Sequence, residues 1–276
     1  MTIQDLKRTA NQLRRDIIEI AYKANGPSHP APALSCCDIV TALYYEIMNV
    51  RPKEPNWPDR DRLILSKGHA CPVVYSALAR KGFFPVEDLM TIRHTGSHLQ
   101  GHPDMKKTPG IDMTSGSLGN GLSLGEGMAL YAKRNRKKYQ VFVILGDGEL
   151  QEGVVWEAAI SSGALKLDNL IAVVDYNHLQ SCGSVEEILP MEPLRNKWED
   201  FGWNVLAING HNMEEIVSAL QVAVNYSGRP TVIIAHTVKG KGVSFMEHDN
   251  SWHQRIPSDA QYIKAMCELE AEAKCL

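Results

Sequence analysis

The sequence predicts an α/β protein built on a doubly wound, mostly parallel sheet flanked by helices. Four short apolar runs rich in β-branched residues indicate strands, at 141–145, 170–174, 203–208 and 231–235. Continuous runs of this kind are typical of strands buried on both faces of a parallel sheet. Helical patterns alternate with them, at 151–166, 190–201 and 212–226. This alternation predicts right-handed crossovers and a ligand site at the carboxyl ends of the strands.

Capping signals predict helices in the N-terminal part of the chain. Thr2 and Asp5 resemble a capping box. The apolar residues that follow lie on one helical face: Leu6, Leu13, Ile17 and Ile20. Ser35 and Asp38 repeat the signal and predict a second helix. Between the two helices, the three prolines of GPSHPAPAL (26–34) predict an extended, non-helical loop. Pro85 begins a further short helix, PVEDLMTIRH.

Length and composition are those of an ordinary globular protein. Hydrophobic residues make up 44% and charged residues 22% of the 276 positions, which excludes a disordered or fibrous chain. The net charge is 29 − 32 = −3, so no general attraction to nucleic acid or to an anionic membrane is expected. No apolar run approaches the ~18 residues of a spanning helix, and MTIQDLKRTA lacks a signal-peptide core. We therefore expect a cytoplasmic protein.

We expect a single domain over residues 1–276. It would comprise a helical and loop-rich N-terminal layer (1–138), a β/α core (139–240), and a final loop and C-terminal helix (241–276). The six cysteines form no CxxC pair, which argues against a thiolate zinc site and a dithiol redox site. We expect them to be reduced and mostly buried.

Polar residues follow two of the predicted strands. One strand runs directly into Gly146-Asp147-Gly148-Glu149, and the next ends in Asp175-Tyr176-Asn177. Asn177 follows Asp147 by 177 − 147 = 30 residues, one β-α-β step, so adjacent strands bring a carboxylate and an amide oxygen to one point. Hard oxygen ligands of this kind suit magnesium or calcium. Gly-Asp-Gly alone is more often a β-turn, but the spaced asparagine makes a metal site the better interpretation.

These segments resemble the transketolase family. GDGELQEG followed by VVDYNHLQSCG is similar to the family's thiamin diphosphate-binding signature. The similarity continues in chain order through SHPAPALSCCDI, DRDRLILSKGHA, LQGHPD, TSGSLGNGLSLGEGMA, HTVKGKGVSFME and SWHQRIP. It covers nearly the whole chain, but only the N-terminal half of a transketolase. The chain is most similar to the separately encoded N-terminal subunits of split transketolases.

The resemblance implies a thiamin diphosphate-binding fold of the diphosphate (PP) type. Asp147, Asn177 and the backbone carbonyl of Leu179 match the ligands of magnesium, for which calcium is the alternative. Glu152 matches an acid in the chain of carboxylates that links paired active sites. The remaining positions expected to bind the cofactor are Gly116, Ser117, Leu118, Gly146, Gly148 and Glu149. His178 follows Asn177 where glycine is frequent in the family, and its bulk is expected to alter the loop.

The same resemblance implies roles for four histidines. His69 and His253 are expected near the diphosphate and the donor hydroxyls. His29 and His102 are expected at the ketose hydroxyls, where protons must move. With Glu152, we expect His29, His102 and His253 to be catalytic, since an imidazole that titrates near neutral pH suits proton transfer. Ala31, Pro32 and Ala33 follow His29 where the family often has glycine, which leaves the donor and acceptor sugars open.

Two other motifs have competing interpretations. His94, His98 and His102 are spaced as on a zinc-binding helix, but glycines and a proline interrupt that segment, so we expect a loop. GSLGNG (116–121) has the spacing GxxGxG and follows no buried strand, which argues against a dinucleotide fingerprint. Gly121, Gly125 and Ala129 then keep one helix face small for close packing. The resemblance implies that this helix lies near a subunit interface.

We expect a transketolase subunit that transfers a two-carbon ketol unit from a ketose phosphate to an aldose phosphate. A branched pentose phosphate such as apulose 4-phosphate is a candidate substrate. In the family, the glutamate that activates the cofactor lies in a following pyrimidine-binding domain. The 276 residues resemble only the part of the family that precedes this domain. We therefore expect the chain to need a C-terminal partner subunit with that domain, with homodimer or heterodimer contacts.

Three alternatives remain open. A 1-deoxyxylulose-5-phosphate synthase shares Gly-Asp-Gly, although GKGVSFMExxxxWH is typical of transketolase. A non-catalytic thiamin diphosphate-binding homologue would keep the fold, although the intact ligands and histidines argue against it. A nicotinamide dehydrogenase would use the same sheet but needs the glycine fingerprint that is missing here.

Overall fold

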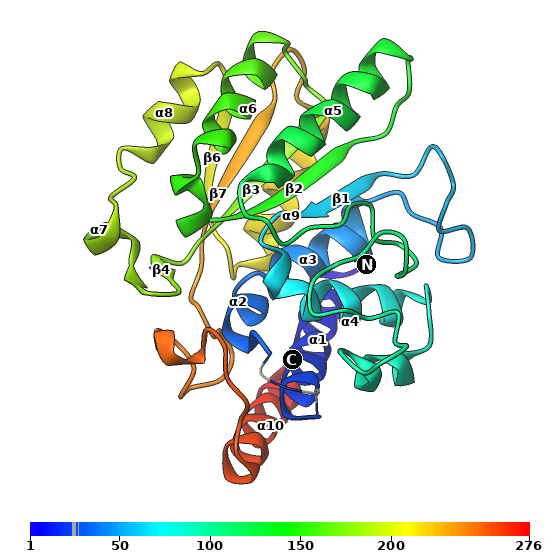
Figure 1. Ribbon diagram of the computed structural model, residues 1–276, viewed down its shortest axis with the longest axis vertical. Coiled ribbons are helices and arrows are strands. Elements are labelled where there is room, and N and C mark those ends of the chain that lie inside the picture. Colours follow the sequence, from blue (N-terminus) through cyan, green and yellow to red (C-terminus); the bar gives the residue numbers. More distant parts are fainter. Residues whose placement is uncertain (24–25, 27) are drawn as a thin grey trace.

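A five-stranded parallel sheet lies at the centre of the computed structural model, which describes residues 1–23, 26 and 28–276 (Figure 1). The strand order is β1-β2-β3-β7-β6, and every pairing is parallel. The strands are β1 (Arg62–Leu65), β2 (Val141–Gly146), β3 (Leu170–Tyr176), β6 (Asn204–Asn209) and β7 (Thr231–His236). The predicted fold class and four predicted strands are therefore confirmed. The sequence pattern does not single out β1, because it is a four-residue edge strand that begins with arginine.

Successive residues of the strands pack against opposite layers of helices. Phe142 and Ile144 face one core, and Val141 and Val143 face the other. The first core contains α1 (Ile3–Lys23), α3 (Cys37–Ala42), α4 (Cys71–Lys81) and α9 (Met213–Asn225). The second contains α5 (Asn120–Arg134), α6 (Gly153–Ala164) and α8 (Leu194–Asp200). Burial on both faces explains why the strands read as continuous apolar runs.

The N-terminal helix begins at the predicted cap. The Asp5 backbone N–H donates to Thr2 Oγ1 at 3.1 Å, and the Thr2 N–H donates to Asp5 Oδ2 at 3.2 Å. The four predicted apolar positions of α1 are fully buried. The C-terminal helix α10 (Asp259–Cys275) packs beside α1 (Figure 1), where Tyr22 stacks on Tyr262 with ring centroids 4.2 Å apart. The N-terminal and C-terminal helices therefore lie side by side in the same helical layer.

The extended loop predicted for 26–34 is wrong in its second half. Pro30 to Ser35 form a helix, α2, with Pro30 at its first position, where the missing N–H is not needed and φ is already suitable. Residues 24, 25 and 27 lie outside the described residues. Ser35 ends α2 and caps nothing, so the second predicted capping box is wrong as well. Its hydroxyl donates to Asp175 instead, and α3 begins at Cys37.

Shorter elements connect this framework. A π-helix, Leu43–Ile47, extends α3, and the segment after Pro85 is a 3-10 helix, Val86–Thr91. Other 3-10 helices are Gly68–Ala70, Gly148–Gln151 and Asn250–Trp252. The two-residue strands β4 (Leu179–Gln180) and β5 (Gly183–Ser184) pair antiparallel before α7 (Val185–Ile188).

The small face of α5 packs on the sheet of its own chain. A Cβ added at Gly125 would lie 2.6 Å from Val143 Cγ2, so only glycine permits this approach. The interface position of this helix remains a prediction. All six cysteines are free, but Cys182, Cys267 and Cys275 are exposed, so the expectation of mostly buried thiols is correct for only three. Of the helices in the described residues, none is long and apolar enough to cross a membrane.

Candidate active site

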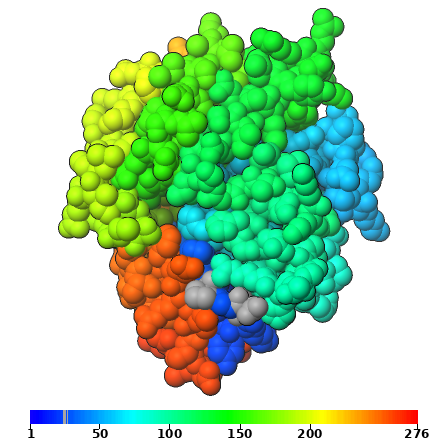
Figure 2. Space-filling view, viewed as in Figure 1, coloured from blue at the N-terminus to red at the C-terminus, as the bar shows by residue number. Residues whose placement is uncertain are grey.

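A cavity of about 370 Å³ opens where β2 and β3 end. Its lining comes from segments far apart in the sequence, and Figure 2 shows the hollow where they meet. The predicted residues in the lining are His29, His69, Gly116, Leu118, Gly146, Asp147, Gly148, Glu149, Glu152, Asn177, Leu179 and His253. Of the predicted set, Ser117 and His102 are not part of this lining. The site therefore forms at the carboxyl edge of the sheet, as parallel topology predicts.

Asp147 is a buried carboxylate held by backbone donors. Its Oδ1 accepts from the Gly148 N–H at 2.8 Å and its Oδ2 from the His178 N–H at 2.5 Å. Burial, and then the neighbouring Asp175, raise the pKa of Asp147 to about 6. The buried Lys67 pairs with Asp175 rather than with Asp147. A carboxylate placed in this way, without a cation of its own in the described residues, suits a metal ion.

Asn177 directly follows β3, and Leu179 begins the short strand β4. Asn177 Oδ1 accepts from the Leu179 N–H at 3.0 Å, while the Leu179 carbonyl accepts from Lys239 Nζ at 3.1 Å. His178 between them has φ +66°, and its exposed ring pairs with Glu186 at 2.5 Å. This left-handed conformation is uncommon for histidine. The loop therefore accommodates His178 with the imidazole ring turned outward, while the His178 backbone N–H donates to Asp147.

Two cavity lysines were not singled out by sequence reasoning. Lys67 Nζ lies 2.5 Å from Asp175 Oδ2 and 2.9 Å from the Pro32 carbonyl. Lys239 Nζ lies 2.6 Å from Asn250 Oδ1, and burial lowers the pKa of Lys239 to about 8. Both side chains are almost completely buried. Lysine is normally exposed, so only the fold reveals them, although both stand in quoted motifs (SKGHA and HTVKGKG).

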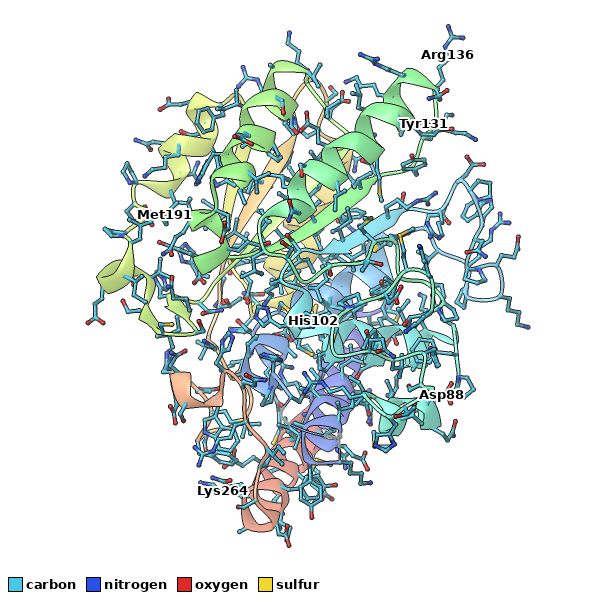
Figure 3. All side chains as sticks on the ribbon, in the orientation of Figure 1. Asp88, His102, Tyr131, Arg136, Met191 and Lys264 are labelled. Atoms are coloured by element: carbon cyan, nitrogen blue, oxygen red, sulfur yellow. The ribbon has the colours of Figure 1, made fainter. Side chains whose placement is uncertain are left out.

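Three histidines from separate segments, His29, His69 and His253, line the cavity, and His102 lies beside His29. The ring centroid of His29 is 5.2 Å from that of His69, 5.5 Å from that of His253 and 6.4 Å from that of His102. His102, labelled in Figure 3, is exposed. Its ring lies against Gly116, where φ is +150° and an added Cβ would be 3.1 Å from His102 Cδ2. The structure therefore brings the four predicted histidines together.

These imidazoles are neutral at pH 7. Burial, followed by the charge of nearby basic side chains, lowers the pKa of His29 to about 4 and that of His253 to about 3. The same causes lower the pKa of His69 and His102. His253 Nδ1 is buried without a hydrogen-bond partner in the part of the chain that the structure describes. Neutral rings can both donate to and accept from substrate hydroxyls.

Acid is expected to destabilise the cofactor-free chain through these histidines. In the unfolded chain an imidazole takes up a proton below about pH 6.5, while the folded His253 stays neutral until about pH 3, so stability falls as the pH drops through this window. His253→Gln removes this group, so its free energy of unfolding should fall less than that of the wild type between pH 7.5 and pH 5. We expect the difference to be about 1 to 2 kcal/mol, after discounting for partial exposure. Urea unfolding measures this. The exposed His94→Gln is the control, and equal shifts in both variants would contradict the assignment.

Glu149 holds the loop that contains Gly116 and Leu118 in place by hydrogen bonds. Its Oε1 accepts from the Gly119 N–H at 2.7 Å and from the Ser66 hydroxyl, and its Oε2 accepts from the Gly146 N–H at 3.0 Å. Both oxygens thus meet donors of the chain itself. Ser117 is exposed and accepts from Asn120, while Glu152 is exposed beside the cavity.

The zinc-helix alternative for His94, His98 and His102 does not hold. His98 Nε2 lies 3.1 Å from Asp88 Oδ2 in a segment without helix, and no cluster of three or more His, Cys, Asp or Glu side chains suited to a metal occurs in the described residues. The predicted loop is confirmed.

Comparison with known proteins decides the family. The family model for the transketolase thiamine diphosphate binding domain matches residues 5–267. The chain belongs to the transketolase family. Its relatives include a 6-deoxy-6-sulfo-D-fructose transketolase subunit of Clostridium sp., 46% identical over 97% of both chains. A subunit of the apulose-4-phosphate transketolase of Phocaeicola vulgatus is 42% identical over 98% of this chain and 95% of that one.

Whole transketolases are much longer than this chain. The human enzyme is 39% identical over 91% of the present chain, which spans 40% of the human one. The crystal structure of the Campylobacter jejuni transketolase is similar with a TM-score of 0.88 and 33% identity, covering 98% of this chain and 43% of that one. The chain is thus a transketolase subunit, a transferase whose cofactor is thiamin diphosphate with a divalent metal. This excludes the nicotinamide dehydrogenase alternative.

Proposed function

We propose that the cavity at the carboxyl edge of the sheet holds the diphosphate end of thiamin diphosphate through magnesium, with calcium as a substitute. Asp147, Asn177 and the Leu179 carbonyl would hold the metal. The observation that carries this proposal is the buried Asp147 carboxylate, which has backbone donors but no cation of its own among the described residues. Lys67 and Lys239 on the same cavity would face the anionic diphosphate.

The residues present fit such a group. The Lys239 ammonium hydrogen-bonds to carbonyl and amide oxygens rather than to a carboxylate, so its charge is available to an anionic group such as a diphosphate. The Gly146 and Gly148 positions keep the floor of the cavity free of side chains, and a Cβ at Gly148 would lie 2.7 Å from Gln180. We propose that the neighbouring loop lies beside the rest of the cofactor. It comprises Gly116, Ser117 and Leu118, and Glu149 holds it by hydrogen bonds.

The histidine cluster would bind the sugar substrate. Thiamin diphosphate, when bound, supplies the carbanion chemistry that breaks and forms the carbon–carbon bond. Around it, the neutral His29, His69, His102 and His253 would orient the sugar hydroxyls by hydrogen bonds. We propose that His29 and His102 also move the proton at the ketose hydroxyl, because a neutral imidazole can accept a proton there and return it.

A companion subunit would complete the site. We propose that residues 1–276 form one thiamin diphosphate-binding domain, and that a C-terminal transketolase subunit supplies the pyrimidine-binding domain and the glutamate at the cofactor. The support is that relatives of equal length are named subunits and that the chain spans 40% of the human enzyme. Leu118 is 38% exposed beside the cavity, and Glu152 is exposed there too. Glu152 would join the carboxylates that link paired sites.

The substrates would be a ketose donor and an aldose acceptor, each with a terminal anionic group. The named relatives act on apulose 4-phosphate and on 6-deoxy-6-sulfo-D-fructose. We propose ketol transfer between sugar phosphates in the cytoplasm, with apulose 4-phosphate as the first donor to test. A sulfonated ketose is the second candidate, because the relative named for it is 46% identical over 97% of both chains.

Mixing experiments test the proposal. The chain alone is expected to show no ketol transfer, since the cofactor-activating glutamate would be missing. Addition of the companion subunit, thiamin diphosphate and magnesium should restore transfer from xylulose 5-phosphate, apulose 4-phosphate or the sulfonated ketose to an aldose phosphate. A coupled assay would record product formation. Transfer by the chain alone at the rate of the mixture would refute the need for a partner.

A further inference from the structure

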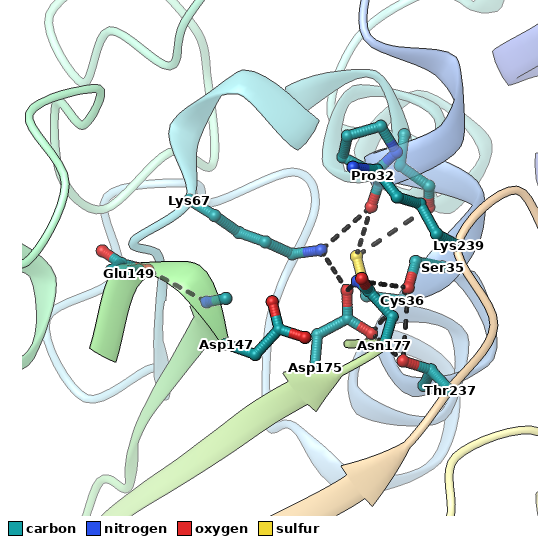
Figure 4. Close-up of polar contacts among 12 residues, drawn as sticks. Pro32, Ser35, Cys36, Lys67, Asp147, Glu149, Asp175, Asn177, Thr237 and Lys239 are labelled. Atoms are coloured by element: carbon teal, nitrogen blue, oxygen red, sulfur yellow. Dashed lines mark hydrogen bonds and ion pairs between the residues drawn. The ribbon is translucent and has the colours of Figure 1, made fainter. Parts of the chain in front are cut away.

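Asp175 lies directly behind the expected metal ligands, near the end of the central strand β3. Its side chain is fully buried and accepts four hydrogen bonds (Figure 4). Oδ1 receives the hydroxyls of Ser35 at 2.8 Å and Thr237 at 2.5 Å. Oδ2 receives Lys67 Nζ at 2.5 Å and Asn177 Nδ2 at 3.2 Å. Asp175 is neither one of the expected metal ligands nor one of the residues that line the cavity.

An ionised carboxylate accepts hydrogen bonds and donates none. The ion pair with Lys67 keeps Asp175 in that form. Ser35 Oγ lies 2.8 Å from Asp175 Oδ1 and 3.3 Å from Thr237 Oγ1, whose own hydrogen is directed to Asp175, so the Ser35 hydrogen points toward these two acceptors and away from Asn177. The Ser35 oxygen is then left as an acceptor, and it lies 3.2 Å from Asn177 Nδ2. Asp175 thus sets the direction of the hydrogen bonds in the whole group.

This direction decides which way round the Asn177 amide sits. Its NH₂ group meets two acceptors, Ser35 Oγ and Asp175 Oδ2. Its Oδ1 accepts from the Leu179 N–H at 3.0 Å, on the side where the metal would bind. A flipped amide would lose all three hydrogen bonds and present NH₂ to a cation. The buried network therefore excludes that orientation.

We propose that Asp175 is a positioning residue that makes Asn177 present its carbonyl oxygen to the metal. The inference rests on the proposed function, because it assumes that Asn177 is a ligand. An outer-shell partner of this kind is worth roughly 10–100-fold in metal affinity. Asp175→Asn removes this fixed direction of the hydrogen bonds, because an amide NH₂ at that position could donate to Ser35, which could then donate to the oxygen of a flipped Asn177 amide.

The test compares three variants of the full chain, each mixed with the companion subunit. Mn²⁺ is the probe, and its binding in the presence of thiamin diphosphate is followed by electron paramagnetic resonance. Asp175→Asn is expected to weaken Mn²⁺ binding by roughly 10–100-fold. Ser35→Ala removes one of two acceptors for the amide and should weaken binding several-fold. Thr237→Val is the matched control, because the Thr237 hydroxyl also contacts Asp175 and Ser35, whereas the Asn177 amide has Ser35, Asp175 and Leu179 as its partners. We expect it to bind Mn²⁺ within twofold of the wild type.

A purely structural role predicts another pattern. Ser35→Ala and Thr237→Val each remove one hydrogen bond to Asp175 Oδ1 and the contact between the two hydroxyls, so a role limited to holding Asp175 in place would weaken Mn²⁺ binding equally in both. Equal loss of Mn²⁺ affinity in these two variants, or wild-type affinity in Asp175→Asn, would overturn the proposal. If Asp175→Asn does not fold, the comparison of Ser35→Ala with Thr237→Val decides alone. A wild-type mixture that binds neither Mn²⁺ nor thiamin diphosphate would refute the proposed function itself.

Discussion

Asp147→Asn is expected to abolish metal-dependent binding of thiamin diphosphate and, with it, ketol transfer. The substitution removes the single carboxylate among the proposed ligands, so the loss should exceed the roughly 10–100-fold expected for an outer-shell partner. The variant should still fold, because burial already disfavours the charged form of this group and raises its pKa to about 6. Calorimetric titration with thiamin diphosphate, with and without magnesium, measures the loss.

An exposed carboxylate provides the control for this substitution. Asp59 is exposed, is not among the residues that line the cavity, and pairs with Lys137 at 2.9 Å. Asp59→Asn should leave cofactor binding unchanged. If Asp147→Asn retained wild-type affinity in the presence of magnesium, Asp147 would not be a ligand. The metal site would then have to be sought elsewhere.

Lys67→Met is expected to cause the largest loss of stability among single substitutions at the site. Lys67 and Asp175 are both buried and lie 2.5 Å apart. Burial alone would lower the pKa of Lys67, but the attraction of Asp175 outweighs it and raises the pKa. Removal of the ammonium leaves a buried carboxylate without its cation, which costs about 3–5 kcal/mol. Urea unfolding of the cofactor-free chain would show this as a lower midpoint.

A surface pair sets the baseline for that measurement. Lys133 pairs with Asp168 at 2.8 Å with both side chains partly exposed, so Lys133→Met should cost less than about 1 kcal/mol. The double variant Lys67→Met with Asp175→Asn should recover part of the stability, because neither charge then remains buried alone. A loss at Lys67 no greater than that at Lys133 would show that the buried pair does not stabilise the fold.

Several features follow from local sequence. The strands after residue 140 are continuous apolar runs, and the structure buries them on both faces. The Thr2–Asp5 cap forms because its hydrogen bonds join residues three apart. Asp147 and Asn177 meet at one cavity because each follows directly on a strand and the two strands are neighbours in a parallel sheet. Short-range geometry and one simple topological rule are enough for these.

Other features depend on distant partners. Ser35 has the local pattern of a helix cap, yet its hydroxyl meets Asp175, 140 positions away. The prolines of α2 suggest an extended loop, but the first turn of a helix tolerates Pro30 and the packed core buries the whole segment. Lys67 and Lys239 are typical surface residues by type, and only their partners explain their burial.

The amino-acid sequence alone predicts the alternation of strands and helices and the oxygen ligands that follow two of the strands. It also places the histidines in the motifs of one family. These depend on residues close together in the chain, or on motifs that stay in order. Only the tertiary structure decides which side chains form ion pairs and hydrogen bonds behind those ligands. The contacts of Asp175 with Ser35 and Lys67 join positions 140 and 108 residues apart. Their strength comes from burial, which no short stretch of sequence specifies.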